Sequence, residues 1–399
     1  EDIHFLQSTD GFPYISPHTI VIDALFGSGL NKPLDGLSKQ LVEHINAAGA
    51  RIVSIDLPSG LYLDAASTGN TIIRAGHTLT FEALKLGLVL QDNALFIGKV
   101  EVLPIGLHPD FEATEESRYE MVEPTFVKAI YRPRSRFAHK GTYGHALLAA
   151  GSWGKVGAAV LAAKACLRSG VGLLTTYIPT CGYDIMQTAL PEAMALTDAN
   201  AVRLTTLPPD IEKYSAIGAG PGIGTDAATG AFLSALISNY RKPLVLDADA
   251  LNLLAQQPHL LKSLPPGSIL TPHPKEFDRL FGRHDTDFDR LASARRRAAE
   301  GGIIILLKGH HTAIATPSGT VYFNTTGNAG LAKGGSGDVL TGILTSLLAQ
   351  GYAPVAAAVL GIYLHGAAAD LCAATLGMES MLPGDLVLFF GGAFREINY

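Results

Sequence analysis

Residues 328–340 read NAGLAKGGSGDVL, a glycine-rich loop that leads directly into a long apolar run. Four glycines lie within eight residues of this stretch, and loop glycines adopt positive φ angles that let backbone amides converge. The first amides of a helix have no partner inside the helix, and the helix dipole favours an anion there. The stretch therefore predicts a phosphate-binding loop that opens a helix.

Asp338 falls in the first turn of that expected helix. A carboxylate at this place stands beside any phosphoryl group that the loop holds. It can take a proton from an attacking hydroxyl while the amides stabilise the transferring phosphoryl group. The alternative is an aspartate that only caps the helix. The clustered glycines, with Lys333 among them, favour the phosphate interpretation.

The chain from Tyr143 to its end alternates between short apolar runs and longer helical patterns. Strands are expected at 144–149, 172–178, 215–219, 243–246, 268–271 and 303–307, with a hairpin at 313–315 and 321–324. Helices are expected at 157–169, 226–239, 274–281, 289–300, 338–349 and 355–374. Strands that alternate with helices predict a parallel sheet covered on both faces.

The N-terminal part repeats the pattern on a smaller scale. A strand at 19–22 ends at Asp23, a helix spans 37–48, and a strand at 51–55 ends at Asp56. A further strand is expected near 77–81. Ligands of open parallel sheets lie beyond the carboxyl ends of the strands, so both aspartates are expected to face one crevice.

Residues 108–136 contain several prolines and little periodicity, which indicates a domain boundary. We expect a first domain at 1–107, a linker at 108–138 and a second domain at 139–399.

Composition narrows the class of protein. The 399 residues are 47% hydrophobic and 17% charged, with a formal net charge of −6, so a well-buried globular chain without the basic surface of a nucleic-acid-binding protein is expected. Three scattered cysteines are typical of a reducing compartment. Neither a signal peptide nor an apolar run of about 18 residues is visible, so we expect a cytoplasmic protein with no membrane span. We also expect the protein to form a homo-oligomer.

The loop at 328–340 resembles the Gly-x-Gly-Asp anion hole of ribokinase-like kinases, and more closely that of the NAD(P)H-hydrate dehydratases. The resemblance extends over about 139–395 and includes further motifs in the same order. These are KGTYGH at 140–145, AGS at 150–152 with GAA at 157–159, GAGPGIG at 218–224, DADALN at 247–252 and TPHPKEF at 271–277. The first domain resembles the NAD(P)H-hydrate epimerase that is fused to this dehydratase in the bifunctional repair enzymes.

The resemblance implies an α/β protein of two domains, namely part of a Rossmann-like αβα domain of the epimerase type and a ribokinase-like αβα sandwich. It implies repair of hydrated NADH and NADPH, with ADP as phosphoryl donor and Mg²⁺ in the dehydratase. The hydroxyl on the hydrated ring is phosphorylated and phosphate then leaves, so the products are NAD(P)H, AMP and phosphate.

The implied dehydratase residues follow from the matching motifs. Asp338 is the expected base, and the anion hole is formed by Gly335, Ser336 and Gly337. The hydrated cofactor is contacted by Ala158, Gly222 and His273. The adenine nucleotide is held by Gly337 and by Lys308, Gly309, His310, His311 and Thr312.

Each of these interpretations has a structural alternative. The adjacent His310 and His311 also fit a polar loop, and His273, between two prolines, also fits a turn histidine bonded to backbone. Asp247 and Asp249 end a strand, and either cap the next helix or organise a magnesium-bound phosphate. Glu276 belongs either to the first-turn charge of a helix or to that phosphate network, and Trp153 either covers the site or packs in its loop.

In the first domain, the resemblance implies K⁺ ligands at Asp23 and Ser59, with Asp56 as the acid or base that faces the hydrated ring. The substrate phosphate loop comprises Gly27, Ser28, Gly29, Leu30, Asn31, Lys32 and Pro33. Strand-end aspartates also commonly cap loops. The Asn/Gly-rich motif that family members carry upstream is absent from the 22 residues before Asp23, so the expectation of epimerase activity from these 399 residues is weak.

Two rival functions share part of this pattern. A ribokinase-like kinase of a vitamin precursor or sugar alcohol has the same loop, but it stops at a stable phosphorylated product and leaves the epimerase-like domain unexplained. A non-catalytic sensor of damaged cofactor does not require Asp338 within a complete loop. The dehydratase interpretation is favoured over both.

Overall fold

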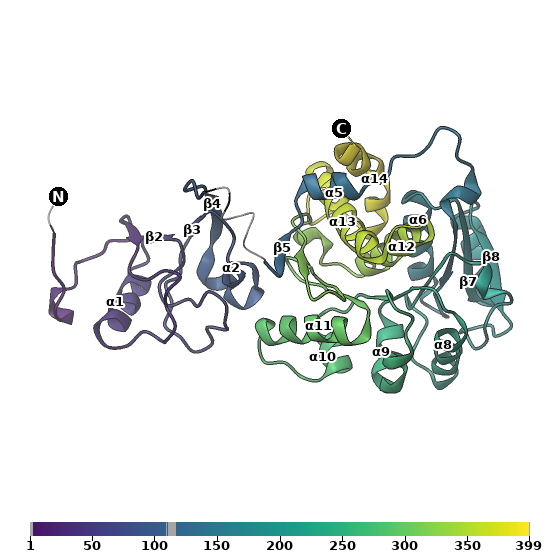
Figure 1. Ribbon diagram of the computed structural model, residues 1–399, viewed down its shortest axis with the longest axis horizontal. Helices are drawn as coiled ribbons and strands as arrows, with labels where there is room; N and C mark the ends of the chain where they lie inside the picture. The colour runs from purple at the N-terminus through teal and green to yellow at the C-terminus, as the bar shows by residue number, and fades with distance from the viewer. Residues whose placement is uncertain (1–2, 109, 111–116, 399) are drawn as a thin grey trace. The chain divides into compact units, whose positions relative to one another are not determined.

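The computed structural model describes residues 3–108, 110 and 117–398. The chain divides into two compact units (Figure 1). Unit 1 comprises Glu1–Ser117 and Asp285–Asp289, and unit 2 comprises Arg118–His284 and Arg290–Tyr399. Each unit contains its own β-sheet, which agrees with the expected α/β class.

Unit 1 contains a four-stranded parallel sheet in the order β1-β2-β3-β4. The strands are β1 (Ile20–Asp23), β2 (Arg51–Ile55), β3 (His77–Phe81) and β4 (Lys99–Leu103), and the helices are α1 (Gly36–Ala47), α2 (Leu86–Val89) and α3 (Ala94–Ile97). Val42 and Ile45 of α1 are buried in a small core with Ile52 of β2. Because β1 and β2 are parallel neighbours, the residues at and after their carboxyl ends, Asp23 and Asp56, lie at one edge of the sheet, as expected.

Unit 2 contains a ten-stranded sheet in the order β5-β14-β13-β12-β11-β10-β9-β6-β7-β8. The strands are β5 (Tyr119–Met121), β6 (His145–Ala149), β7 (Leu173–Pro179), β8 (Met194–Asp198), β9 (Ala216–Ala219), β10 (Leu244–Leu246), β11 (Ile269–Leu270), β12 (Ile304–Leu307), β13 (Ala313–Ala315) and β14 (Val321–Phe323). Strands β6 to β12 are parallel to one another. The expected hairpin is formed by β13 and β14. The strand order reverses between β6 and β9, where open α/β sheets bind their ligands.

Helices cover both faces of this sheet (Figure 1). One group comprises α5 (Pro124–Ile130), α6 (Val156–Arg168), α12 (Ser336–Ala349), α13 (Pro354–Leu376) and α14 (Pro383–Asn398). The other comprises α8 (Ala227–Asn239), α9 (Asp249–Gln256), α10 (Pro274–Phe281) and α11 (Asp287–Gly301), while α7 (Tyr183–Ala189) precedes β8.

Helix α12 is buried along most of its length. Glycines permit this close packing, because a Cβ on Gly218 of β9 would lie 2.2 Å from Thr345 Oγ1, and one on Gly342 would lie 2.1 Å from the Ala162 carbonyl oxygen.

Helix α13 is long and apolar enough to cross a membrane by length and composition alone. Most of it is buried inside unit 2, where it packs against α12 and α14. Burial in the core of unit 2 accounts for this composition.

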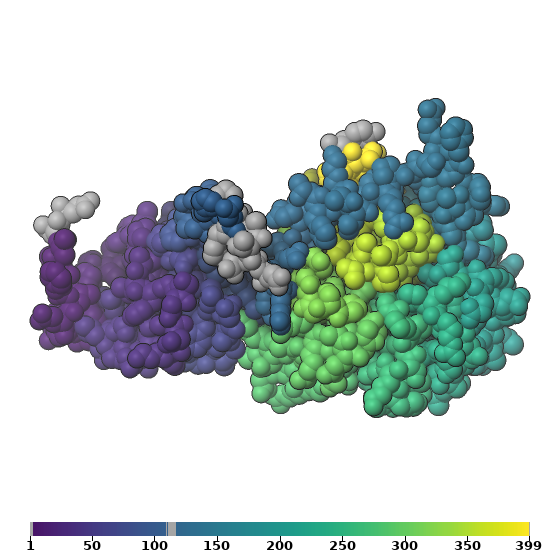
Figure 2. All heavy atoms as spheres, in the orientation of Figure 1, coloured from purple at the N-terminus to yellow at the C-terminus, as the bar shows by residue number. Residues whose placement is uncertain are grey.

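The second half of the expected linker belongs to unit 2. Strand β5 pairs with β14, and α5 packs against α13 and α14. Residues coloured as 117–145 in the space-filling view lie over the C-terminal helices (Figure 2). Arg132 stacks on the Tyr352 ring at 4.5 Å and donates to the Gly351 carbonyl at 3.1 Å. These residues look like a linker in sequence because β5 has only three residues and its partner strand lies about 200 positions further along the chain.

Candidate functional site

The glycine-rich loop of 328–340 ends where α12 begins, as expected. Gly335 is the N-cap residue with φ 105°, a conformation that favours glycine. A Cβ on Gly337 would lie 3.1 Å from Asp247 Oδ2 and 3.5 Å from Lys308 Nζ, so this position is crowded by charged groups. Gly335, Ser336 and Gly337 therefore open the helix beside an ion pair, and the Ser336 amide donates to the Lys333 carbonyl at 3.3 Å.

Asp338 is partly buried in the first turn of α12. Burial raises the pKa of its carboxyl to about 6, the negative charge of Asp247 adds to this effect, and the Lys308 ammonium opposes it. A carboxyl with a pKa near neutral is suited to accept a proton and hold it through a reaction step. The electrostatics therefore fit the predicted role as a base, which remains a prediction.

Asp247 is fully buried after β10 and lies between two donors. Lys308 Nζ lies 3.0 Å from its Oδ1, and Thr341 Oγ1 donates to its Oδ2 at 3.0 Å. Although burial alone would raise the pKa of Asp247, the Lys308 ammonium and hydrogen bonds from Thr271, Lys308 and the Ala248 backbone hold it below its usual range. The carboxylate is thus the counter-ion of Lys308, and whether Asp247 also caps the next helix or organises a magnesium-bound phosphate stays a prediction.

Lys308 follows β12 and joins two carboxylates. Besides Asp247, the Glu276 Oε2 atom lies 4.0 Å from Lys308 Nζ. Burial disfavours the ammonium, but the charges of Asp247 and Glu276 more than compensate, so the pKa of Lys308 is raised. The cation is therefore permanent, and it lies next to the first turn of α12.

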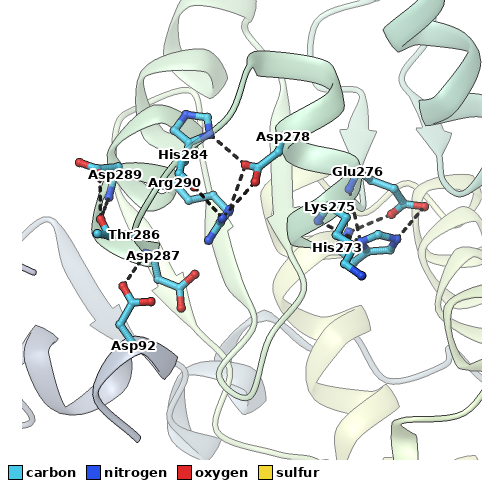
Figure 3. Close-up of polar contacts among 10 residues, drawn as sticks. All are labelled: Asp92, His273, Lys275, Glu276, Asp278, His284, Thr286, Asp287, Asp289 and Arg290. Carbon is cyan, nitrogen blue, oxygen red and sulfur yellow. Dashed lines mark hydrogen bonds and ion pairs between the residues drawn. The ribbon is translucent and has the colours of Figure 1, made fainter. Parts of the chain in front are cut away.

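His273 caps α10, and Figure 3 shows the arrangement. Its Nδ1 accepts from the amides of Lys275 and Glu276 at 3.1 and 3.3 Å, while Glu276 Oε2 accepts from the His273 amide at 2.9 Å. Burial lowers the pKa of His273, although the Glu276 carboxylate opposes this effect. The backbone-bonded alternative holds for Nδ1. The ring keeps one edge toward solvent, because the side chain is 44% exposed.

Two of the three residues that the resemblance assigns to the hydrated cofactor, Ala158 and Gly222, lie together. A Cβ on Gly222 would meet the Ala158 Cβ at 3.2 Å, so the two residues are in direct contact. Ser152 Oγ donates to the Gly222 carbonyl at 2.7 Å. Asp249 Oδ2 accepts from the Gly224 amide at 2.9 Å and lies 3.2 Å from Lys155 Nζ, so Asp249 ties this loop to α9.

A cavity of about 380 Å³ lies between the β12–β13 loop, the glycine-rich loop and α13. This volume is within the range of small-molecule sites. Its walls include Lys308, Gly309, His310, Thr312, Asn328, Ser336, Gly337 and His365. His311 is not among the lining residues; its Nδ1 lies 3.0 Å from the Asn324 carbonyl oxygen, and burial lowers its pKa. Four of the five expected residues at 308–312 thus line one cavity with Gly337.

The structure also bears on two other side chains that sequence reasoning linked to the site. Lys333 Nζ donates to the carbonyls of Glu379 and Met381 at 2.6 Å, so the ammonium ties the loop to the start of α14 and does not face a phosphate. Trp153 is 73% exposed, which is inconsistent with loop packing of its ring.

Unit 1 brings Asp23 and Ser59 together. Asp23 is buried, its Oδ1 accepts from Ser59 Oγ at 2.5 Å, and its Oδ2 accepts from the Ser59 amide at 2.9 Å and from Ser54 Oγ at 2.7 Å. The side-chain atoms gathered here are all oxygens, which are the ligand atoms that hard cations prefer. Asp23 also caps its own loop through the Leu25 amide at 3.5 Å. The set thus fits both the K⁺ interpretation and the capping alternative.

Asp56 has a positive φ of 69°, which is unfavourable for a residue with a Cβ. A Cβ on Gly27 would lie 3.3 Å from Asp56 Oδ2, so the expected phosphate loop begins beside this carboxylate. Lys85 Nζ lies 2.9 Å from Asp56 Oδ1. Sequence reasoning missed Lys85, although its place four residues after β3 puts it at the same sheet edge as the two aspartates.

Comparisons with known proteins give matches to both parts of the chain. A family model described as NAD(P)H-hydrate dehydratase matches residues 146–388, and one described as YjeF-related protein N-terminus matches 2–87. The bifunctional NAD(P)H-hydrate repair enzyme Nnr of Moorella thermoacetica is 39% identical over 95% of this chain and 73% of its own length. The chain belongs to the bifunctional NAD(P)H-hydrate repair enzyme family. The family member from Escherichia coli is 35% identical over 92% of this chain and 70% of its own length.

Solved structures resemble the dehydratase part of this family. The ADP/ATP-dependent NAD(P)H-hydrate dehydratase of Bacillus subtilis, co-crystallised with ATP and Mg²⁺, superposes with a TM-score of 0.61 at 33% identity, over 70% of this chain and 98% of its own. A ribokinase-like protein of Enterococcus faecalis gives 0.63 at 28% identity, over 71% and 99%. The ribokinase-like fold expected for 139–399 is thereby confirmed.

Proposed function

We propose that unit 2 dehydrates the S epimers of hydrated NADH and NADPH with ADP as phosphoryl donor, and that unit 1 serves the epimerisation of the R and S hydrates. The observation that carries the proposal is Asp338, a carboxyl with a pKa of about 6 at the start of α12. It lies within the electrostatic influence of Asp247 and Lys308. Family membership supplies the substrate class.

The residues of unit 2 suit a two-step reaction that balances. Asp338 takes the proton of the ring hydroxyl as the hydroxyl oxygen attacks the β-phosphoryl group of ADP, and AMP leaves. The neighbouring ring carbon then gives up a proton to the departing phosphate as the C–O bond breaks, which releases inorganic phosphate and restores the ring double bond of NAD(P)H. Water, as hydroxide, is a poor leaving group, so phosphorylation is the step that makes elimination feasible. The amides at 335–337 and Lys308 are placed to stabilise charge on the transferring group.

The nucleotide is assigned to the cavity that ends at Gly337. Among the described residues there is no group of three or more His, Cys, Asp or Glu side chains that could hold a metal ion. Mg²⁺ commonly binds through substrate phosphates and waters with one or two carboxylates, which fits a site with few protein ligands. When bound, it would neutralise charge on the ADP phosphates. Asp247 and Asp249, which follow β10, are the carboxylates proposed to organise the magnesium-bound phosphate.

In unit 1, Asp56 is the proposed acid or base, and the loop of Gly27, Ser28, Gly29, Leu30, Asn31, Lys32 and Pro33 is the proposed phosphate loop. K⁺ is assigned to Asp23 and Ser59. The ion pair between Lys85 and Asp56 supports a functional role for that carboxylate, because it holds the side chain in one position. We expect the protein to be cytoplasmic and to form a homo-oligomer. Light scattering on the purified protein tests the oligomeric state.

The deciding experiment follows the return of reduced-nicotinamide absorbance. Purified protein is mixed with S-configured NADH hydrate, Mg²⁺ and either ADP or ATP. Recovery with AMP and phosphate formed in equal amounts is expected with ADP. A stable phosphorylated product without recovery would refute the dehydratase and identify a kinase. Addition of the R hydrate then tests unit 1. If unit 1 is active, absorbance returns from the R hydrate faster than its spontaneous epimerisation allows.

A further inference from the structure

Trp153, the single tryptophan of the chain, is exposed on a loop whose backbone is held by hydrogen bonds. The loop follows β6 and leads into α6. The Gly151 amide donates to the Pro221 carbonyl at 2.7 Å. The Trp153 amide donates to the Val202 carbonyl at 2.8 Å. A fixed backbone therefore presents this large aromatic side chain to solvent, 73% exposed.

The loop that accepts the Trp153 amide is itself held by Asp198, the last residue of β8. The buried Asp198 carboxylate accepts from the amides of Asn200 and Thr205 at 2.8 and 2.6 Å. Asn200 Oδ1 in turn accepts from the Val202 amide at 3.0 Å. Hydrogen bonds thus connect the end of β8 to the backbone of Trp153. Such an arrangement reduces the ordering cost of binding a ligand against the indole ring.

Trp153 lies between two residues that contact Gly222. Ser152 Oγ, one position earlier, donates to the Gly222 carbonyl at 2.7 Å. Lys155, two positions later, packs on the same glycine, because a Cβ on Gly222 would lie 3.0 Å from Lys155 Cβ. The resemblance assigns Gly222 to the hydrated cofactor, so a ligand at that residue lies next to the segment that carries Trp153.

The order of the strands places Trp153 on the side of this ligand site away from the reacting groups. Trp153 follows β6, and the Val202 carbonyl that it bonds to follows β8, at the end of the sheet that runs β6-β7-β8. Asp247 and Lys308 follow β10 and β12, on the other side of β6. The reacting hydroxyl must reach Asp338 on that other side. The far end of a dinucleotide, its adenosine, is then directed toward Trp153.

Two cations belong to the same pair of loops. Lys155 Nζ lies 3.2 Å from Asp249 Oδ2, and the lysine side chain is 55% exposed. Arg203, in the loop that accepts the Trp153 amide, lies 2.6 Å from Asp226 Oδ1 and is 36% exposed. Ion pairs with this much exposure are weak, so both cations are available to phosphate groups. An exposed aromatic ring near two cations matches the base and the diphosphate of a dinucleotide.

We propose that Trp153 is a substrate-positioning residue whose indole ring stacks on the adenine ring of the hydrated dinucleotide. Adenine is aromatic and the hydrated nicotinamide ring is not, so adenine is the better stacking partner. ADP, which also contains adenine, is assigned to the separate cavity that ends at Gly337. The proposal rests on the proposed function in one respect, that the substrate is a hydrated dinucleotide.

Intrinsic fluorescence reports on this contact directly, because Trp153 is the single tryptophan of the chain. The protein is titrated with S-configured NADH hydrate in the absence of a phosphoryl donor, so that no turnover occurs. N-acetyltryptophanamide titrated in parallel corrects for absorption by the ligand. We expect saturable quenching with NADH hydrate and no change with ADP alone. The S-configured hydrate of reduced nicotinamide mononucleotide, which lacks the adenosine part, should bind without quenching.

Calorimetry then measures the Kd of both hydrates for two variants of Trp153. Loss of a base–aromatic stack corresponds to a Kd increase of about 5-fold to 150-fold. We expect Trp153→Ala to weaken NADH hydrate by about that factor and to leave the mononucleotide hydrate unchanged. Trp153→Phe keeps an aromatic ring and should recover much of the affinity. Phe137→Ala, which removes another exposed aromatic side chain of unit 2, is the matched control and should leave both values unchanged.

Other outcomes overturn the proposal. Binding of NADH hydrate without quenching, or an unchanged Kd in Trp153→Ala, would mean that the indole does not contact the ligand. Equal weakening of both hydrates in Trp153→Ala would mean that the indole does not stack on adenine. Quenching by NADH hydrate without return of absorbance when ADP and Mg²⁺ are added would refute the proposed function but not this contact. A wild-type protein that does not bind NADH hydrate would refute both.

Discussion

The clearest consequence of the Asp338 environment is that Asp338→Asn should stabilise unit 2 while it abolishes turnover. In the folded protein the pKa of this carboxyl rises from 3.8 to about 6. Each pKa unit corresponds to about 1.4 kcal/mol, so the ionised carboxylate costs up to roughly 3 kcal/mol at pH 7. Because the side chain is only partly buried, we expect about 2 kcal/mol of stabilisation from the neutral amide.

The direction of the Asp338 pKa shift determines the pH range over which the stability of the protein changes. A carboxyl whose folded pKa is raised is favoured in its protonated form, so its contribution to stability is fully present below pH 3.8 and is lost as the pH rises through about 6. The asparagine does not titrate. The stability difference between variant and wild type should therefore be small near pH 4, grow through pH 6 and stay constant above pH 7.

The assay is urea unfolding of both proteins at several pH values, followed by circular dichroism. Turnover should fall by about 10²–10⁴-fold, the usual contribution of a general base. Asp184→Asn is the matched control, since Asp184 is an exposed aspartate in the first turn of α7. A variant that is no more stable than wild type at pH 7, or a difference that does not change with pH, would refute the electrostatic account of Asp338.

Further substitutions at four positions test the remaining residues of the two candidate sites. Lys308→Met leaves the buried Asp247 carboxylate without its counter-ion, and thermal unfolding should show a loss of about 3–5 kcal/mol; a smaller loss than in exposed-lysine variants would contradict the burial of this pair. His273→Ala removes a helix cap worth about 0.5–2 kcal/mol and should raise the KM for the hydrate. His273→Asn, which can still cap the helix, should restore stability but not the KM. If His273→Asn restored both, the role of His273 would be limited to capping. Asp56→Asn should slow only the interconversion of R and S hydrates, as measured by chiral chromatography; an equal effect on dehydration of the S hydrate would contradict the division of labour between the units. Lys85→Met should reproduce the Asp56→Asn phenotype, because it frees that carboxylate.

The features predicted from sequence are those that local pattern determines. The glycine-rich stretch of 328–340 predicted the start of α12 because positive φ angles and a first-turn aspartate are local properties. The strands that end at Asp23 and Asp56 were predictable because apolar runs followed by polar residues mark the carboxyl edge of a parallel sheet. Residues 308–312 were expected at this edge for the same reason, as they follow the buried strand β12, whereas their assignment to the nucleotide came from the family resemblance.

The features that sequence reasoning missed depend on pairings between distant residues. Strand β8 lies at an edge of the sheet and has an irregular burial pattern, so its sequence lacks a clear period. Helix α14 was missed as well, although it packs on α13. The Lys308 ion pair joins residues 61 positions apart, and the Thr341 bond to the same carboxylate joins residues 94 positions apart. No local pattern encodes such contacts, and they decide the charge state of the site.

Asp338, in the first turn of α12, and His365, on α13 beside the Ser336 backbone, have opposite effects on the pH dependence of stability. His365 has a folded pKa of about 4 against an ordinary 6.5, so its burial costs nothing above pH 6.5 and up to roughly 3 kcal/mol once the pH falls below 4. Asp338 loses a similar amount as the pH rises from 3.8 to about 6. Over the range from pH 4 to 6 the two contributions nearly cancel, so the first turn of α12 contributes little net pH dependence in the wild-type protein. Removal of the carboxylate alone exposes the histidine contribution, and for that reason Asp338→Asn should gain stability with rising pH while the wild-type protein does not.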